Sequence, residues 1–284
     1  MPVIHFLNVR NGDCSIIQHY SGNVTVIDVN NAKYLSPFGS KLPQNYLTGL
    51  LAGYSQNQKD NPENPIKYLL DHGVSSVFRF ILTHPDMDHM DGIKAFFNIF
   101  KPVNFWDTAN KEDKQSFVCS PYNEEDWRFY KDLRDSNSNT DPKRLTLLSG
   151  ANGKYFNADE SGKNGGDGLH VLAPNTELIK KANESGDYND CSYVILYKTD
   201  GHKIIFSGDS HDKTWEFILN NHLIDVTNID LLIAPHHGRE SKRSYEFLDY
   251  LRPKLTFFGN ASSNDLAYSA WNYRKWWCKI NCVN

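Results

Sequence analysis

Apolar and polar positions alternate along the chain in a way that predicts short strands separated by helices. Near the amino terminus, residues 3–9, 14–19 and 24–29 form apolar, β-branched segments joined by turns at 11–13 and 21–23. Similar apolar runs predict further strands at 77–82, 102–106, 169–174, 203–206 and 229–234. Helical spacing predicts helices at 65–72, 92–100 and 124–133. Interleaved strands and helices are typical of an α/β protein.

The hairpins at the start of the chain are echoed in its second half. Residues 13–15 and 190–192 are both Asp-Cys-Ser, and each begins a hairpin whose second strand ends at an aspartate, Asp28 or Asp209. A duplicated, β-rich half packed face to face against its copy would explain the repeat, although two short matches can also arise by chance. In the first copy, Asp13 is expected to be a turn residue and not a ligand.

Two stretches interrupt the predicted elements. Residues 31–64 are rich in Asn, Gln, Lys, Ser and Pro, and residues 110–168 end in a glycine-rich loop at 149–168. We predict both to be insertions in a single domain that spans residues 1–284, because α/β domains of about 200–250 residues are common.

The densest group of reactive side chains lies in residues 83–92, directly after the predicted strand at 77–82. Five metal-binding side chains fall within eight residues, and they are His84, Asp86, Asp88, His89 and Asp91. Pro85 prevents a helix from starting here, so the ligands lie on a loop at the carboxyl end of a strand, where α/β proteins place chemistry. An EF-hand calcium loop is excluded, because its acids stand at the first, third and fifth positions with glycine sixth. The pattern H-x-D-x-D-H favours a metal site over a solvated polar turn, and lets one loop serve two adjacent metals.

This segment resembles the second motif of the metallo-β-lactamase-fold hydrolases, usually H-x-H-x-D-H, with Asp86 where the second histidine normally stands. The Asp variant resembles the metallo-β-lactamase-like domain of bacterial competence (DNA-uptake) channel proteins and its stand-alone relatives. The His-His-Gly motif at 236–238 resembles the same type. The resemblance covers residues 3–30, 65–106 and 169–260, and it implies a four-layer α/β/β/α sandwich with a binuclear hydrolase site.

The resemblance also implies roles for residues outside the loop. Asp28 holds the metal loop in place, and Asp209, after the strand at 203–206, bridges both metals. Asp190 occupies the region of the third motif, and is either a ligand of the first metal or a turn-capping aspartate. In the final motif one histidine completes the second metal, and the other contacts substrate or donates a proton. We favour His236 as the ligand and His237 as the catalytic residue.

The implied cofactors are two divalent metal ions that hold a hydroxide between them. The predicted ligands are His84, Asp86, Asp88, His89, Asp190, Asp209 and His236. Carboxylates in place of histidines favour Mn²⁺, with Mg²⁺ compatible, whereas the histidine nitrogens also suit Zn²⁺. Asp88 is predicted to orient the hydroxide as well as to bind metal.

Charged and aromatic residues near the carboxyl end give two further candidate surfaces. Arg239, Lys242 and Arg243 either begin a solvated helix or hold a substrate phosphate beside the metals. Residues 268–277 interleave aromatic rings with two cations, a pattern compatible with base stacking, core packing or a protein interface.

Composition narrows the environment and the partners. The 284 residues carry a net charge of −4, which argues against a large non-specific nucleic-acid footprint, although bound metals would add positive charge. The five cysteines are odd in number and lack a Cys-x-x-Cys pair, so reduced thiols are expected. With no signal peptide and no apolar run long enough to span a bilayer, the sequence predicts a soluble, cytoplasmic protein without a membrane partner.

Three functional hypotheses follow. The first is a metal-dependent phosphodiesterase, namely a nuclease acting on DNA, and the competence-type resemblance motivates that substrate. The second is an ester, lactone or thioester hydrolase, since one fold serves many substrates. The third is an accessory subunit of a bacterial system such as phage defence, active only with a partner protein that docks on residues 268–277.

Overall fold

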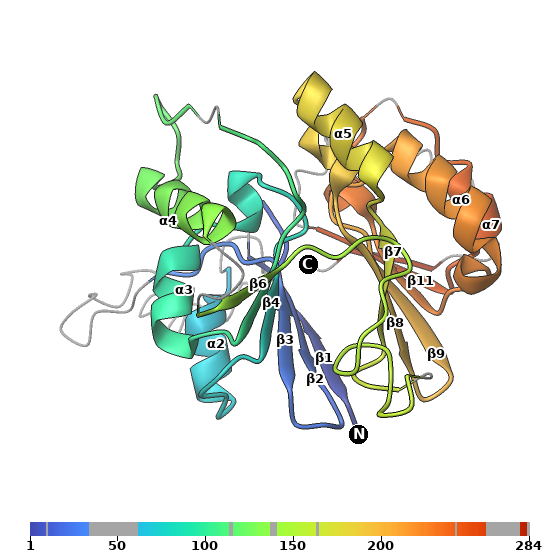
Figure 1. The fold of residues 1–284 in the computed structure, drawn as a ribbon, viewed down its shortest axis with the longest axis horizontal. Coiled ribbons are helices and arrows are strands. Elements are labelled where there is room, and N and C mark those ends of the chain that lie inside the picture. The colour runs from blue at the N-terminus through green and yellow to red at the C-terminus, as the bar shows by residue number, and fades with distance from the viewer. Residues whose placement is uncertain are drawn as a thin grey trace, which may run out of the picture.

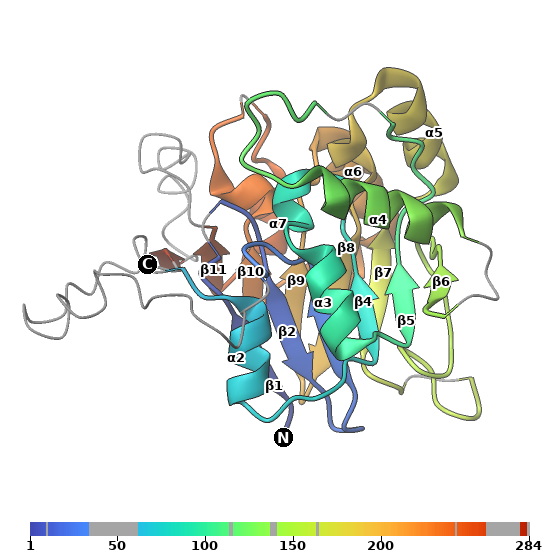
Figure 2. The same cartoon turned by 90° about the vertical axis from the view of Figure 1, so that its left-hand side faces the viewer.

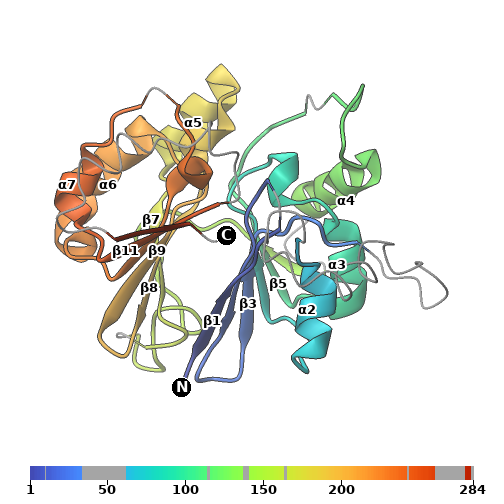
Figure 3. The ribbon, with the colours of Figure 1, turned by 180° about the vertical axis from the view of Figure 1, so that it is seen from behind.

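The computed structural model describes residues 1–9, 11–33, 62–113, 116–136, 141–162, 165–241, 243–259 and 279–282. Two mixed β-sheets face each other, and helices cover the outer side of each sheet (Figure 1, Figure 3). Each sheet has six strands. The predicted α/β/β/α sandwich is confirmed.

The two sheets repeat one topology. The first sheet contains, in order, β1 (Val3–Phe6), β2 (Ser15–Gln18), β3 (Val24–Ile27), β4 (Arg79–Ile81), β5 (Asn104–Trp106) and β6 (Lys143–Leu145). The second sheet contains, in order, β7 (Leu169–Ala173), β8 (Val194–Thr199), β9 (His202–Phe206), β10 (Leu231–Ile233), β11 (Leu255–Phe258) and β12 (Lys279–Cys282). In each sheet the first three strands pair antiparallel and the later strands continue in parallel. This confirms the duplicated half that the Asp-Cys-Ser repeat predicts.

Helices flank each sheet on its outer side. Those of the first half are α2 (Pro65–Asp71), α3 (Ile93–Phe100) and α4 (Glu124–Asp135), seen face-on in Figure 2. Those of the second half are α5 (Thr176–Ser185), α6 (Asp212–Val226) and α7 (Phe247–Leu251). Asn64, Asn123 and Asn175 cap the starts of α2, α4 and α5 by accepting backbone N–H bonds. Among the described residues, no helix has the length and apolar character that a membrane crossing requires.

Side chains on the two faces of a strand belong to different hydrophobic cores. On β2, Ile16 packs under the outer helices, whereas Ile17 packs between the sheets. On β8, Leu196 packs under the outer helices and Ile195 packs between the sheets. Successive side chains of a strand point to opposite faces, so strands covered on both sides need apolar residues at consecutive positions. This is why the strands are near-continuous apolar runs in the sequence.

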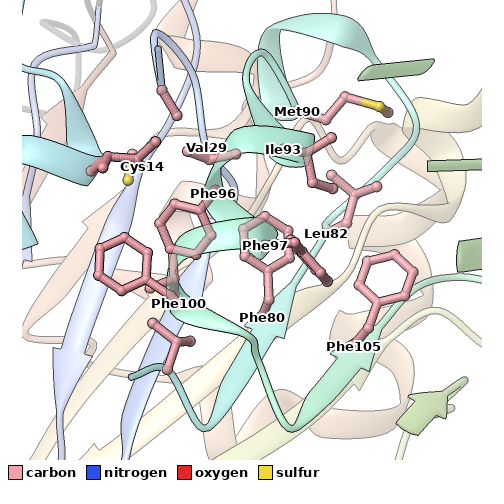
Figure 4. Close-up of a cluster of buried hydrophobic side chains, with 14 of the residues drawn as sticks. Cys14, Val29, Phe80, Leu82, Met90, Ile93, Phe96, Phe97, Phe100 and Phe105 are labelled. Atoms are coloured by element: carbon pink, nitrogen blue, oxygen red, sulfur yellow. The ribbon is translucent and has the colours of Figure 1, made fainter. Parts of the chain in front are cut away.

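The outer core of the first half is built largely from phenyl rings (Figure 4). α3 presents Phe96, Phe97 and Phe100 to the sheet at helical spacing. The ring of Phe80 on β4 lies 5.5 Å from that of Phe96 and 5.1 Å from that of Phe97. Burial of each ring contributes roughly 1.5–3 kcal/mol. This core anchors the helix that directly follows the loop at 83–92.

Some elements are not predicted by the sequence pattern, among them α5, α6 and β6. Part of the predicted insertion at 110–168 belongs to the sandwich, because β6 pairs with β5 and α4 packs beside α3. Of the predicted insertion at 31–64, residues 34–61 lie outside the described residues.

Candidate metal centre

The predicted site residues gather at one edge of the two sheets. β3 and β4 are parallel neighbours, as are β9 and β10, so their carboxyl ends lie side by side. Asp28 follows β3, the loop at 83–92 follows β4, and Asp209 follows β9. Three short 3₁₀ turns carry the remaining candidates: η2 (Met87–His89), η3 (Tyr188–Cys191) and η4 (Pro235–Gly238).

Asp209 stands at the middle of the cluster. Its Oδ1 lies 3.2 Å from His89 Nε2 and 3.6 Å from His237 Nε2. Its Oδ2 lies 3.8 Å from His84 Nε2 and 3.8 Å from His236 Nε2. Asp209 is only 3% exposed. One buried carboxylate therefore faces two separate histidine pairs, which is the arrangement of a carboxylate that bridges two ions.

Several buried atoms of this cluster lack protein partners. Within the described part of the chain, no hydrogen bond is made by Nε2 of His84, Nε2 of His89, either ring nitrogen of His237 or Oδ1 of Asp209. Carboxylate oxygens lie 3.2–3.4 Å from His89 Nε2 and from the ring nitrogens of His237. Buried polar atoms are nearly always bonded, and a cation held between these acids and imidazoles would complete their contacts. Imidazole nitrogens and carboxylate oxygens are ligands of divalent first-row metals. The residues therefore fit a divalent metal centre.

Two carboxylates of the loop approach the histidines from the solvent side. Asp86 Oδ2 lies 3.5 Å from His84 Nε2, and the Asp86 side chain is 44% exposed. Asp88 Oδ2 lies 3.4 Å from His237 Nε2, and the Asp88 side chain is 20% exposed. The buried histidines lie behind these carboxylates, so the cluster opens to solvent at Asp86.

A network behind the loop fixes the histidines. Asp28, which is 1% exposed, accepts hydrogen bonds at 2.7 Å from both the backbone N–H and the hydroxyl of Thr83. Asp28 Oδ2 also lies 2.8 Å from His89 Nδ1. This contact holds the His89 ring so that Nε2 faces Asp209, as carboxylates behind metal-binding histidines commonly do. These contacts match the supporting role that the resemblance implies for Asp28.

The turn η4 directs its two histidines to different sides. His236 and His237 have φ values of 53° and 56°, a left-handed conformation that costs roughly 1–3 kcal/mol at each non-glycine residue. The His237 side chain is 1% exposed and lies among Asp88 and Asp209, whereas that of His236 is 24% exposed. His237 therefore lies inside the cluster, whereas His236 lies at its solvent edge with Nε2 at 3.8 Å from Asp209 Oδ2. The assignment of His236 as the ligand and His237 as the catalytic residue stays a prediction.

Buried acids control the protonation of the two inner histidines. Burial opposes protonation of His237, but nearby carboxylates, Asp209 foremost, outweigh it and raise the pKa of His237 to about 10. Burial also opposes protonation of His89, yet Asp209 and Asp28 raise its pKa well above the usual value. For the outer His236, burial dominates and lowers the pKa to about 4. In the metal-free protein the inner histidines therefore hold protons at neutral pH, and a metal must displace them.

Asp190 lies in a neighbouring group. Its ligand atoms lie within 4.8 Å of those of Asp187 and His211, and its Oδ2 accepts a hydrogen bond from Lys213 at 3.0 Å. Asp190 is thus grouped with Asp187 and His211, and its role as a ligand of the first metal stays a prediction. The two groups adjoin, because the ring of His211 stacks on that of His236 with centroids 6.0 Å apart.

The predicted phosphate-binding residues lie at the same edge. Arg243 Nη2 lies 3.0 Å from His236 Nδ1. Arg239 directly follows η4 and is half-buried. Lys242 lies outside the described residues, as does the aromatic segment at 268–277.

Asp13, which the sequence predicts to be a turn residue, lies beside the cluster. Its ligand atoms lie within 4.8 Å of those of His89, Asp209 and His237, although it comes from the turn before β2. A possible signal in the sequence is the repeat, which gives Asp13 the same position in the first half that Asp190 has in the second.

No protein-family model matches the chain, and no curated protein matches its sequence. Among solved structures, isothiocyanate hydrolase from Delia radicum gut bacteria is 15% identical with a TM-score of 0.50, over 99% of this chain and 96% of that one. A variant of the CmlA β-hydroxylase of Streptomyces venezuelae is 10% identical with a TM-score of 0.50, over 98% of this chain and 52% of that one. The metallo-β-lactamase fold protein YhfI from Bacillus subtilis is 11% identical with a TM-score of 0.48, over 100% and 97% of the two chains.

The chain has the metallo-β-lactamase fold, with two mixed sheets that each repeat one topology between outer helices. At this level of sequence identity the likeness concerns the fold alone, because one fold serves many reactions. The chemistry has to be argued from the cluster itself.

Proposed function

We propose that this protein is a two-metal hydrolase that cleaves phosphodiester bonds in DNA. The observation that carries the proposal is the buried Asp209 carboxylate, whose two oxygens face two separate histidine pairs. Paired ions in such sites clamp both the attacking and the leaving oxygen of a phosphoryl group. The choice of DNA rests on the likeness of residues 83–92 and 236–238 to the competence-type domain.

Each oxygen of Asp209 would serve one ion. The first ion would be held by His84, Asp86 and Oδ2 of Asp209, with His236 at its edge. The second would be held by His89, His237 and Oδ1 of Asp209, with Asp88 nearby. Because carboxylates supply a large share of the donors, we propose Mn²⁺, with Zn²⁺ and Mg²⁺ as the alternatives.

Two divalent ions bound at these ligands would supply an activated water and would neutralise charge on the scissile phosphoryl group. Asp88 is partly exposed beside the inner histidines and is placed to orient the attacking water. Burial opposes its ionisation, but His237 and His89 outweigh that and hold the pKa of Asp88 well below its usual value, so it stays a charged acceptor. His236, at the solvent edge and in contact with Arg243, is placed to contact the substrate. Arg243 would hold a phosphate oxygen through its guanidinium N–H groups.

The wider substrate surface would use the basic residues after η4. Arg239 and Lys242 extend the positive charge of Arg243 along the chain, and would track the phosphates on either side of the cut. Residues 268–277 would stack bases or dock a partner protein.

Two alternatives belong to other functional classes. In the first, the substrate is a small ester, lactone or thioester. The isothiocyanate hydrolase, which shares the fold over nearly its whole length, is an example of a hydrolase that acts on a small molecule. The other alternative is an accessory subunit of a bacterial defence system that cuts only with a partner bound. The converging ligand atoms of the cluster argue against an inert scaffold.

Cleavage of labelled single- and double-stranded DNA with Mn²⁺, Mg²⁺ or Zn²⁺ tests the proposal. The control is the double variant Asp88→Ala, His89→Ala, which removes ligand atoms of the second ion. Cutting that depends on metal and is lost in the control would support the nuclease and rank the metals. If metal-loaded protein cuts neither DNA, RNA nor a chromogenic phosphodiester, a stand-alone nuclease is ruled out.

A further inference from the structure

We propose that Asp13 is a direct ligand of the second metal ion, together with His89, His237 and Asp209. The inference rests on the proposed two-metal function and deepens it by adding a ligand from the amino-terminal turn. The ligand atoms of these four residues all lie within 4.8 Å of one another. Four donors bound at about 2.1 Å from one ion lie roughly 3.4 Å apart, so a small contraction of the group closes the coordination shell.

The burial of the group indicates that it is built for a ligand. His89, Asp209 and His237 are each less than one-tenth exposed, and the Asp13 side chain is 16% exposed. Nε2 of His89, Oδ1 of Asp209 and both ring nitrogens of His237 have no hydrogen-bond partner within the described residues. Three residues from three separate segments therefore aim unbonded atoms at a common point, and Asp13 joins them from a fourth segment; the arrangement is costly unless a cation occupies that point.

An orienting role for Asp13 explains the geometry less well. Asp13 Oδ1 lies 3.3 Å from His237 Nδ1, the distance expected of a carboxylate that holds the ring from behind. Such a carboxylate would stand about 6 Å from an ion bound at the other ring nitrogen. Asp13, however, lies within 4.8 Å of the ligand atoms of both His89 and Asp209. Its carboxylate is therefore close enough to the other donors to bind the same ion, which a carboxylate that only orients the His237 ring does not need.

The backbone of the turn is shaped to bring Asp13 to this place. Gly12 has a φ of 143°, and a Cβ added there would lie 2.1 Å from the backbone oxygen of Asp88. Only glycine allows the turn at 11–13 to approach the metal loop so closely. The repeat adds a second argument, because Asp13 and Asp190 hold equivalent positions in the two halves and each joins a group of metal-ligand type.

Charge balance also favours this ligand set. Two carboxylates and two neutral imidazoles would neutralise one divalent ion. Asp88 would then not be needed to neutralise the ion, and its ionised carboxylate would contact the attacking water. Its position at the solvent side of the cluster agrees with this role.

Binding of Mn²⁺ to chelator-stripped protein tests the assignment without any substrate. Free Mn²⁺, measured by electron paramagnetic resonance during titration, should show two sites per wild-type chain. Asp13→Asn should keep the first site and weaken the second by more than about tenfold. Asp200→Asn is the matched control, because it removes the same charge from an exposed residue in contact with Tyr20. That variant should bind as the wild type does.

A second variant guards against a merely structural explanation. Asp13→His replaces an oxygen ligand with a nitrogen ligand, and should shift the preference of the second site from Mn²⁺ towards Zn²⁺. Both Asp13 variants should melt cooperatively in chelator, which shows that they fold.

The outcomes separate this inference from the proposed function. Asp13→Asn protein that binds both ions with wild-type affinity would overturn the ligand assignment and leave Asp13 as an orienting or turn residue. Wild-type protein that binds two ions but cuts no DNA would contradict the proposed substrate, while the Asp13 titration would still decide the ligand. Wild-type protein that binds no Mn²⁺ or Zn²⁺ would overturn both.

Discussion

Two buried polar clusters lie between the sheets, one at each end of β4. Arg79 begins β4, and His84 follows its carboxyl end. Around Arg79 both terminal guanidinium nitrogens are bonded, although its Nε is not: Asp167 Oδ2 lies 3.1 Å from both, Thr25 accepts at 2.7 Å, and the backbone oxygen of Tyr155 accepts at 2.9 Å. Around His84, imidazole nitrogens and carboxylate oxygens converge and remain unbonded.

The difference separates a structural cluster from a binding cluster. Asp167 is also bonded by Ser21 at 2.6 Å and by Asn23 at 3.0 Å, so the carboxylate that balances Arg79 is itself well supported. Breaking such a buried ion pair is costly, because loss of one partner leaves an unpaired buried charge. At the other end of β4, several acid and imidazole atoms have no hydrogen-bond partner within the described residues. Binding of a cation to them would therefore stabilise the fold.

The largest expected effect is on metal binding. Asp209→Asn should lower the affinity for both ions by more than about 1,000-fold, over about 4 kcal/mol, because one residue serves both sites. Equilibrium dialysis with Mn²⁺ measures this loss. In the presence of chelator, Asp209→Asn should lower the free energy of unfolding by less than Asp167→Ala does. Retention of either ion at wild-type affinity would show that Asp209 does not bridge.

At the Arg79 end of β4, the expected effect is on the stability of the fold. Asp167→Ala should lower the free energy of unfolding by about 3–5 kcal/mol, since it leaves the buried Arg79 charge without its counter-ion. Urea denaturation in chelator measures the change, and Asp200→Ala, at an exposed carboxylate, is the control. The folded fraction of Asp167→Ala should still bind metal normally. If it loses metal and keeps its stability, the two clusters are not separable in this way.

A smaller effect is expected from the residue that supports the loop. Asp28→Asn should weaken metal binding by about 10–100-fold, because it disturbs the orientation of His89 without removing a ligand. The same dialysis experiment applies. A loss as complete as that of Asp209→Asn would make Asp28 a ligand, and no loss would leave it with a purely structural role.

The mildest test uses pH. His89 and His237 have raised pKa values in the metal-free fold, so their contribution to stability is present below about pH 6.5 and is lost as the pH rises through the raised pKa values, which for His237 is about 10. Chelated protein should therefore unfold more easily at pH 9 than at pH 6. Metal affinity should change in the opposite direction, by up to about tenfold per pH unit for each proton displaced. Titration calorimetry in buffers of different ionisation enthalpy should detect the released protons, and buffer-independent enthalpies would contradict this account.

The loop at 83–92 could be predicted because its ligands are local. Five ligand types within eight residues need no tertiary information, and the apolar runs around them reveal strands buried on both faces. The repeat of Asp-Cys-Ser likewise predicts two similar sheets. These two signals place the site and support a duplicated sheet, whereas the four-layer architecture is what the resemblance of residues 83–92 and 236–238 to the metallo-β-lactamase-fold hydrolases implies.

The remaining features depend on long-range contacts. Asp13 meets His237 only when the two halves pack together, and the roles of His236 and His237 depend on two left-handed residues that no local pattern encodes. β6 consists of Lys143, Arg144 and Leu145, which lack the composition of a strand and become one by pairing with β5. In α6 the exposed Leu223 and Ile224 obscure the apolar face formed by its buried residues.

Asp209 is proposed to hold two ions between the halves of the sandwich. Anomalous diffraction from a crystal soaked with Mn²⁺ would test it most directly. The account predicts two peaks roughly 3.5–4 Å apart, one at each oxygen of Asp209. A single peak, or peaks confined to the group of Asp187, Asp190 and His211, would contradict it.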